Sequence, residues 1–123
     1  DVYKRQVCLG TRAKSEAELE RSFQAHLVKT LKSLYPGCIV LKNDSGYLQG
    51  VPDLTILYKD RWAVLEVKAS SDSKEQPNQQ YYVDLINEMS FGAFIHPENE
   101  EEVLYGLEQA FRSRRSTRVS FSK

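Results

Sequence analysis

Two carboxylates and a lysine lie at the ends of neighbouring apolar segments in the middle of the chain. Asp53 precedes one segment, and Glu66 and Lys68 close the next. Because side chains alternate between the two faces of a strand, Glu66 and Lys68 share a face. A short hairpin would bring all three side chains to one end of a sheet. Carboxylate oxygens bind hard divalent cations, so this spacing predicts a site for Mg²⁺ or Mn²⁺.

The same residues have a simpler interpretation. An E-x-K triplet at the end of a strand is commonly a solvent-exposed ion pair, and an aspartate beside a proline can cap a turn. In that case the chain is a structural domain without a catalytic site. This interpretation predicts that Glu66 and Lys68 pair in solvent and that Asp53 caps a turn.

A helix is predicted from residue 15 to about residue 34, and it carries a further carboxylate on its apolar side. A capping-box signature opens it, and apolar residues recur at helical spacing. At about 100° per residue, Glu20 projects only about 20° from Leu27, inside the apolar stripe. Because burying an unpaired carboxylate costs several kcal/mol, Glu20 must be solvated at the stripe's edge, paired with a base or bound to a metal. Glu16 lies one turn earlier, where water and the helix dipole can stabilise it.

Four strands and two more helices complete the predicted order of helix, three strands, helix, strand and helix. The predicted strands cover residues 38–42, 54–58, 62–67 and 93–96. The first should be largely covered, and the second and third, as near-continuous apolar segments, should be central strands covered on both faces. Pro77 suits the first position of a helix, which places Gln79 and Gln80 in the first turn. Asn99 is the predicted cap of a last helix that reaches about Phe111.

Composition excludes some classes of protein. With 123 residues the chain can build one hydrophobic core. Its 17 basic and 17 acidic residues cancel, so total charge does not call for a nucleic-acid partner. Neither Cys8 nor Cys38 belongs to a C-x-x-C pair, which argues against a disulfide framework or structural zinc and favours a reducing, cytoplasmic compartment. No apolar segment approaches the roughly 18 residues that span a bilayer, so no membrane partner is expected.

The order of elements resembles the αβββαβ core of the PD-(D/E)XK nuclease superfamily. The residues that carry the resemblance are Pro52, Asp53, Glu66, Val67 and Lys68, with Glu20 on the preceding helix. Within the superfamily, G-V-P-D-L and L-E-V-K followed by P-N-Q are most similar to the VRR-NUC type and to similar small phage-encoded nucleases. The resemblance implies a restriction-endonuclease-like α/β fold, in which helices flank a mixed four-stranded sheet and a further helix follows at the C-terminus.

The resemblance also implies an activity, the Mg²⁺- or Mn²⁺-dependent hydrolysis of phosphodiester bonds in DNA by an endonuclease. The oxygen ligands would be Asp53, Glu66, Glu20 and the carbonyl of Val67. Lys68 would position the attacking water and neutralise charge that develops in the transition state. Relatives usually carry a glutamine after the E-x-K, which could hold the water or a phosphate oxygen. The P-x-Q spacing favours Gln79, while Gln80 beside it leaves the register open.

An alternative function is a non-catalytic nucleic-acid-binding module on the same scaffold, which would bind DNA equally well with and without a chelator. If the chain is a nuclease, its substrate could be linear duplex, flap, nicked or junction DNA. The prediction therefore includes a structure-selective or junction-resolving enzyme. Enzymes of this size that cut both strands usually use two active sites, so the family analogy implies a homodimer.

Both ends of the chain stand apart from the predicted nuclease domain of residues 15–111. Residues 1–14 are expected to be disordered or artefactual, since D-V-Y-K-R-Q resembles the in-frame translation of a transposon end used to prepare sequencing libraries. Residues 112–123 form a tail with five basic residues and no acid. Such a tail is either solvated and disordered or supplies sequence-independent phosphate contacts.

Overall fold

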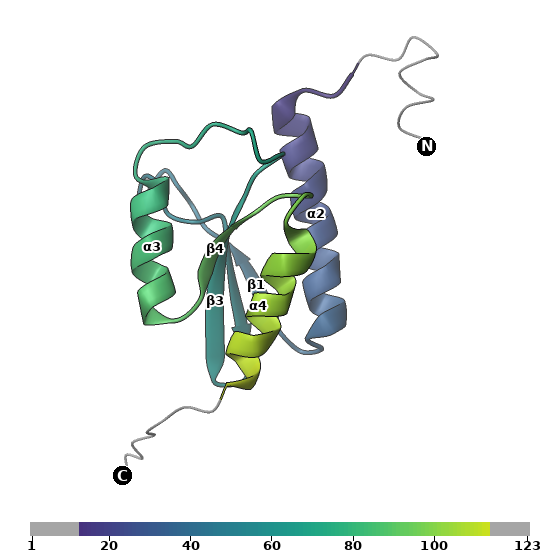
Figure 1. The fold of residues 1–123 in the computed structure, drawn as a ribbon, viewed down its shortest axis with the longest axis vertical. Coiled ribbons are helices and arrows are strands. Elements are labelled where there is room, and N and C mark those ends of the chain that lie inside the picture. Colours follow the sequence, from purple (N-terminus) through teal and green to yellow (C-terminus); the bar gives the residue numbers. More distant parts are fainter. Residues whose placement is uncertain (1–12, 114–123) are drawn as a thin grey trace.

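A four-stranded sheet lies at the centre of the structure, a computed structural model that describes residues 13–113 (Figure 1). The elements in chain order are α2 (Glu16–Leu34), β1 (Ile39–Lys42), β2 (Leu54–Tyr58), β3 (Arg61–Val67), α3 (Gln79–Met89), β4 (Gly92–Ile95) and α4 (Glu100–Arg112). The predicted order of elements is therefore confirmed. Residues 1–12 and 114–123, which hold most of the two predicted terminal segments, lie outside the described residues.

The sheet is mixed, as predicted, and its strand order is β1-β2-β3-β4. β1, β2 and β3 form an antiparallel meander, and β4 pairs with β3 in parallel. A parallel pair needs a crossover connection, and α3 provides it. The register sets Leu54 opposite Leu65 and Glu66 beside Phe94. The end of β3 therefore lies beside the start of β2, where Asp53 precedes the strand.

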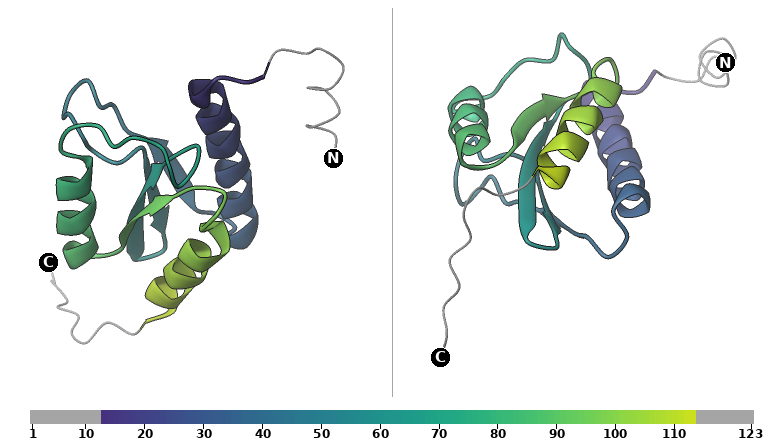
Figure 2. Two further views of the ribbon diagram at one scale, coloured as in Figure 1. Left: turned by 45° about the horizontal axis from the view of Figure 1, so that its top comes forward. Right: turned by 60° about the horizontal axis from the view of Figure 1, so that its bottom comes forward.

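Helices cover the two faces of the sheet unequally. α2 and α4 lie on one face and α3 on the other (Figure 2). The core between α2, α4 and the sheet contains Phe23, Leu27, Leu31, Leu54, Ile56, Leu65, Val67, Ile95, Val103 and Leu107. On the other face α3 packs over β3 and β4, where Gly92 lies against the carbonyl of Val83. The capping box of α2 forms as predicted, with Glu18 N–H donating to the Ser15 hydroxyl and Glu18 accepting from Ser15 N–H.

The prediction that the first strand is largely covered is wrong. β1 is an edge strand, and Ile39 and Leu41 are 54% and 44% exposed. Both point to the face that α3 covers only over β3 and β4. β2 and β3 are the inner strands, as predicted, but Leu57 in β2 is exposed on that uncovered half of the sheet. In β3, residues 63–67 are buried on both faces.

The predicted start of α3 differs from the structure, and the predicted cap of α4 has the right position but not the expected hydrogen bond. α3 begins at Gln79, because Asn78 adopts a left-handed conformation with φ of 70° and ends the preceding loop. Pro77 therefore precedes the cap and is not the first helical residue. Asn99 does precede α4, but its side chain makes no cap hydrogen bond. It binds the backbone of the preceding turn instead, at His96 N–H and the Phe94 carbonyl.

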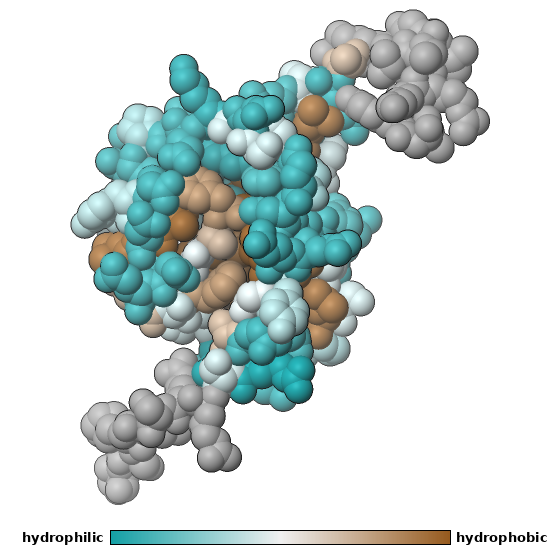
Figure 3. All heavy atoms as spheres, in the orientation of Figure 1, coloured by the Kyte–Doolittle hydropathy of each residue, from teal (hydrophilic) through white to brown (hydrophobic). Residues whose placement is uncertain are grey.

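Apolar side chains gather over β4, between α3 and α4, and a hydrophilic rim surrounds them (Figure 3). This apolar patch follows the free edge of the sheet, because β4 is the second outer strand. Within residues 13–113, no helix is both long and apolar enough to span a membrane.

Candidate active site

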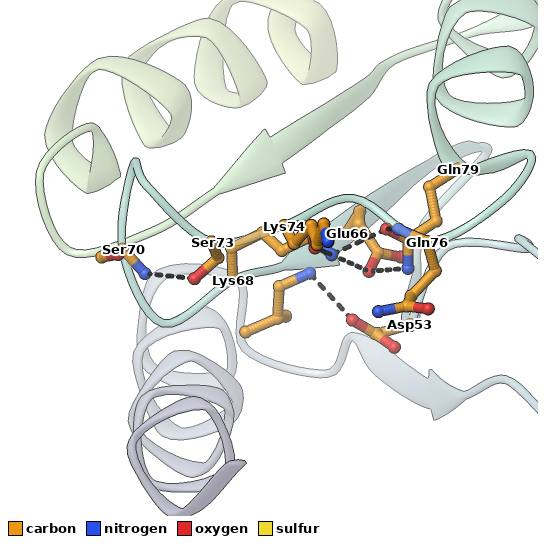
Figure 4. Close-up of polar contacts among 9 residues, drawn as sticks. Asp53, Glu66, Lys68, Ser70, Ser73, Lys74, Gln76 and Gln79 are labelled. Atoms are coloured by element: carbon orange, nitrogen blue, oxygen red, sulfur yellow. Dashed lines mark hydrogen bonds and ion pairs between the residues drawn. The ribbon is translucent and has the colours of Figure 1, made fainter. Parts of the chain in front are cut away.

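The five predicted site residues line one cavity at the end of the sheet. Its volume is about 290 Å³. The residues are Asp53, Glu66, Lys68, Glu20 and Gln79, and they come from the start of β2, the end of β3, the first half of α2 and the start of α3. Val67 turns its side chain into the core, so only its backbone belongs to the site. Figure 4 shows Asp53, Glu66, Lys68 and Gln79 pointing toward one another.

Asp53 is held against the backbone of the neighbouring strand. Its Oδ2 accepts a hydrogen bond of 2.9 Å from Val67 N–H. Asn43 fixes the chain on both sides of Asp53, since its Nδ2 lies 2.8 Å from the Pro52 carbonyl and 2.8 Å from the Thr55 hydroxyl. Asp53 thus links β2 to β3 and does not simply cap a turn.

Glu66 and Lys68 form a buried pair. Glu66 is 2% exposed and Lys68 is 6% exposed, and Lys68 Nζ lies 3.7 Å from Glu66 Oε2. This burial excludes the interpretation of E-x-K as an ion pair in solvent. Lys68 also donates to the Lys74 carbonyl at 3.1 Å and to Gln79 Oε1 at 2.7 Å. Because a lysine has three N–H donors, these two bonds leave one donor for Glu66 or for a ligand in the cavity.

Gln79 connects the loop, the lysine and the carboxylate. Its Oε1 accepts from both Lys68 and Gln76 N–H, and its Nε2 donates to Glu66 Oε2 at 2.8 Å. Gln80 bonds Asp84 on the exposed side of α3 instead. Of the two glutamines between which the sequence leaves the choice open, Gln79 is therefore the one that contacts Lys68 and Glu66.

The second oxygen of Glu66, Oε1, is buried, and among residues 13–113 it has no hydrogen-bond partner. Burial is the main reason why the pKa of Glu66 rises to about 8, and the charge of Asp53 raises it further. Lys68 lowers the pKa, whereas a hydrogen bond that only the protonated carboxyl can form with Asp53, and the charge of Glu20, raise it. Ionised Glu66 therefore lacks a positive partner at Oε1.

A divalent cation would supply the charge that Oε1 lacks. Glu66 and Asp53 offer hard anionic oxygens, and the backbone of Val67 lies beside both. Among residues 13–113, no three His, Cys, Asp or Glu side chains are arranged to hold one metal ion. A cation here would thus be bound by two carboxylates with carbonyl and water oxygens, a set that Mg²⁺ tolerates because it keeps several waters.

Glu20 lines the cavity without joining such a three-carboxylate group. It is half-buried, and burial, Asp53 and Glu16 raise its pKa, while Lys68 lowers it. Glu16 is exposed at the rim of the same cavity. Glu20 is therefore the more deeply placed of the two candidates on α2, as the apolar stripe predicted.

Sequence reasoning missed the backbone groups that the loop before α3 supplies to the site. Lys74 contributes a carbonyl and Gln76 an N–H, and side-chain types cannot reveal either contact. Gly50 is the residue in the sequence that could have indicated a close contact between two loops. Its φ is 92°, and a Cβ there would lie 2.6 Å from Asn78 Cβ and 2.8 Å from the Pro77 carbonyl. This close approach joins the loop before Asp53 to the loop before Gln79.

Comparisons of the chain with protein-family models, with curated proteins and with solved structures find no match. The chemistry of the cavity therefore carries the functional assignment.

Proposed function

We propose that the chain is a metal-dependent nuclease of the PD-(D/E)XK type, with a restriction-endonuclease-like fold, that hydrolyses phosphodiester bonds in DNA. The observation that carries the proposal is the buried, unpartnered Oε1 of Glu66 beside Asp53. A structural domain gains nothing from an oxygen in that position, because an unsatisfied buried acceptor costs about 1 to 3 kcal/mol. In a metal site the same oxygen is a ligand.

Asp53, Glu66 and the Val67 carbonyl would hold Mg²⁺ or Mn²⁺, and Glu20 lines the same cavity. When bound, the ion lowers the pKa of a water and polarises the scissile phosphate. Lys68 keeps its ammonium group within 3.7 Å of Glu66, where it can orient a water and neutralise charge on the phosphate. Gln79 holds Lys68 and Glu66 in this relation through its two amide atoms.

The negative charge of the cavity is a second reason to expect a bound divalent cation. Among the residues that the structure describes, Glu16, Glu20, Asp53 and Glu66 line it, and Lys68 and Lys74 are the cations. A phosphate that enters without a metal meets an excess of negative charge, so DNA affinity should depend on the divalent ion. This dependence separates the nuclease from the alternative, a non-catalytic binding module, whose affinity a chelator leaves unchanged.

The test is cleavage of linear, flapped, nicked and four-way-junction DNA by the purified chain with Mg²⁺ or Mn²⁺. Asp53→Ala and Lys68→Ala should each abolish cleavage while circular dichroism and thermal melting show a folded domain. Matched controls are Asp84→Ala and Lys29→Ala, two exposed positions outside the cavity. Undiminished cleavage by either cavity variant, or no product from the wild type on any substrate, contradicts the proposal.

By analogy with the family, we also propose that the chain acts inside the cell as a homodimer. Light scattering of the purified chain, with and without DNA, tests the oligomeric state. A monomer that cuts both strands of a duplex without associating would contradict the homodimer and leave the nuclease assignment intact.

A further inference from the structure

A second cavity, of about 190 Å³, opens beside the central one and shares Lys68 and Ser73 with it. One wall is the turn of residues 70–73, and the other is formed by Phe94 and His96 at the end of β4. On the opposite side a third cavity, of about 300 Å³, shares Asp53, Gln76 and Gln79 with the central one. Figure 4 shows Ser70 and Gln79 on opposite sides of Lys68. The three cavities therefore lie in a row with the carboxylates in the middle.

The sheet register places the second cavity one strand away from the carboxylates. Phe94 is the β4 partner of Glu66, and adjacent strands lie about 4.8 Å apart. The ladder continues beyond the strand, since Lys68 N–H donates to the Ile95 carbonyl at 2.9 Å. Ile95 is fully buried in the core, so Phe94 and His96 on either side of it lie on the opposite face of the sheet and line the cavity together with Lys68.

The walls of the second cavity suit a planar, uncharged ring. Phe94 is half-buried and offers an aromatic surface, and the serine hydroxyls opposite it can donate and accept hydrogen bonds. Glu75 and Lys68 both line this cavity, so their opposite charges offset each other and a second phosphate gains no net attraction there. The serine wall is held in place, because Ser70 N–H donates to the Ser73 hydroxyl at 3.1 Å and Lys68 binds the Lys74 carbonyl.

A polynucleotide has such a ring on each nucleotide. Stacking on an aromatic side chain is a sequence-tolerant way to hold a base, since every base has a π face. A base in a duplex cannot enter a side cavity unless it leaves the helical stack, which costs free energy. A phosphate at Glu66 with its neighbouring base at Phe94 thus requires an unpaired nucleotide.

We propose that the cavity between Phe94, His96 and residues 70–73 is a subsite for the base next to the scissile phosphate. The preferred substrate is then a single-stranded or frayed segment and not an intact duplex. This inference rests on the proposed nuclease function, and it adds a substrate class to it.

The test is single-turnover cleavage of a single-stranded oligonucleotide and of its perfect duplex with Mg²⁺. In further substrates an abasic site replaces the nucleotide on one or the other side of the preferred cut. We expect the single strand to be cut faster than the duplex, and removal of one flanking base, on one side only, to slow cleavage about 5- to 150-fold. Phe94→Leu should slow cleavage of the intact strand by a similar factor. This variant should cut the abasic substrate and the intact strand at the same rate.

Two further variants separate stacking from folding. Phe94→Tyr keeps the ring and should retain the abasic effect, while Tyr105→Leu removes an exposed aromatic ring from α4, outside all three cavities, and should behave as the wild type. Thermal melting monitors the fold of each. A duplex cut as fast as the single strand, or a Phe94→Leu variant that still responds to base removal, overturns the subsite alone. Absence of any cleavage by the wild type overturns the nuclease function and the subsite with it.

Discussion

Stability at alkaline pH without metal should be limited by one side chain, Glu66. In the unfolded chain its carboxyl ionises near the ordinary value of 4.5, whereas in the folded chain burial and Asp53 raise its pKa to about 8. Between these values the folded chain holds a proton that the unfolded chain has released. The stability contributed by protonated Glu66 is therefore fully present below pH 4.5 and is lost as the pH rises through 8. The two pKa values correspond to a loss of about 5 kcal/mol.

Glu66→Gln isolates this contribution, because glutamine keeps the shape of the protonated acid and can still accept the hydrogen bond from Gln79. In urea denaturation with a chelator, we expect the variant and the wild type to have similar free energies of unfolding at pH 4.5. At pH 9 the variant should be more stable by several kcal/mol. Other titrating groups, including Glu20, affect both proteins and largely cancel in the difference.

Two further measurements complete this test. Glu88→Gln, at an exposed position on α3, is the matched control and should shift stability equally at both pH values. Mg²⁺ at pH 9 should stabilise the wild type more than Glu66→Gln, since only the ionised carboxylate attracts the cation. If the difference between Glu66→Gln and the wild type is the same at pH 4.5 and pH 9, the reasoning from burial and the unpartnered oxygen is refuted.

Three other predictions concern the supports of the site. Gly50→Ala should lower the free energy of unfolding by about 2 to 4 kcal/mol, because of its left-handed φ and the clash of the new Cβ with Asn78. Gly37→Ala is the control, since its φ is 89° but nothing lies within 4 Å of the added Cβ, so it should cost only the backbone strain. Equal losses in the two variants would contradict the role of the close approach at Gly50. Ser15→Ala should lower the free energy of unfolding by about 1 kcal/mol through loss of the capping box, and an unchanged urea midpoint would exclude it. Residues 114–123 hold four basic residues in a chain of zero net charge. Their removal should weaken DNA binding and reduce the dependence of the affinity on salt concentration, without moving the cut site. An unchanged salt dependence would show that the tail makes no phosphate contacts.

Local patterns in the sequence were sufficient for the elements that depend on neighbouring residues. The capping box and apolar spacing predicted α2 to within a residue, and the apolar segments around Lys59 predicted the β2–β3 hairpin. Period-two alternation also placed Glu66 and Lys68 on one face. Each of these features follows from interactions within a few residues, which a sequence displays directly.

Burial and loop contacts depended on partners that the sequence does not reveal. β1 is as apolar as an inner strand, and its exposure follows from its outer position and from the limited reach of α3. The start of α3 was misplaced because Asn78 adopts φ of 70°, next to Gly50 from a distant loop. Such contacts between remote segments override local preference, as the tertiary context commonly does.

The sequence by itself determined which groups could do chemistry, since residue type and spacing identified Asp53, Glu66, Lys68 and Glu20, and the family resemblance implied a glutamine at position 79 or 80. Only the tertiary structure decided their electrostatic state. Folding buries Glu66 to 2% exposure, leaves its Oε1 without a donor and uses Gln79, not Gln80, to join it to Lys68. The reason is physical, because desolvation and the proximity of charges come from segments that are far apart in the chain.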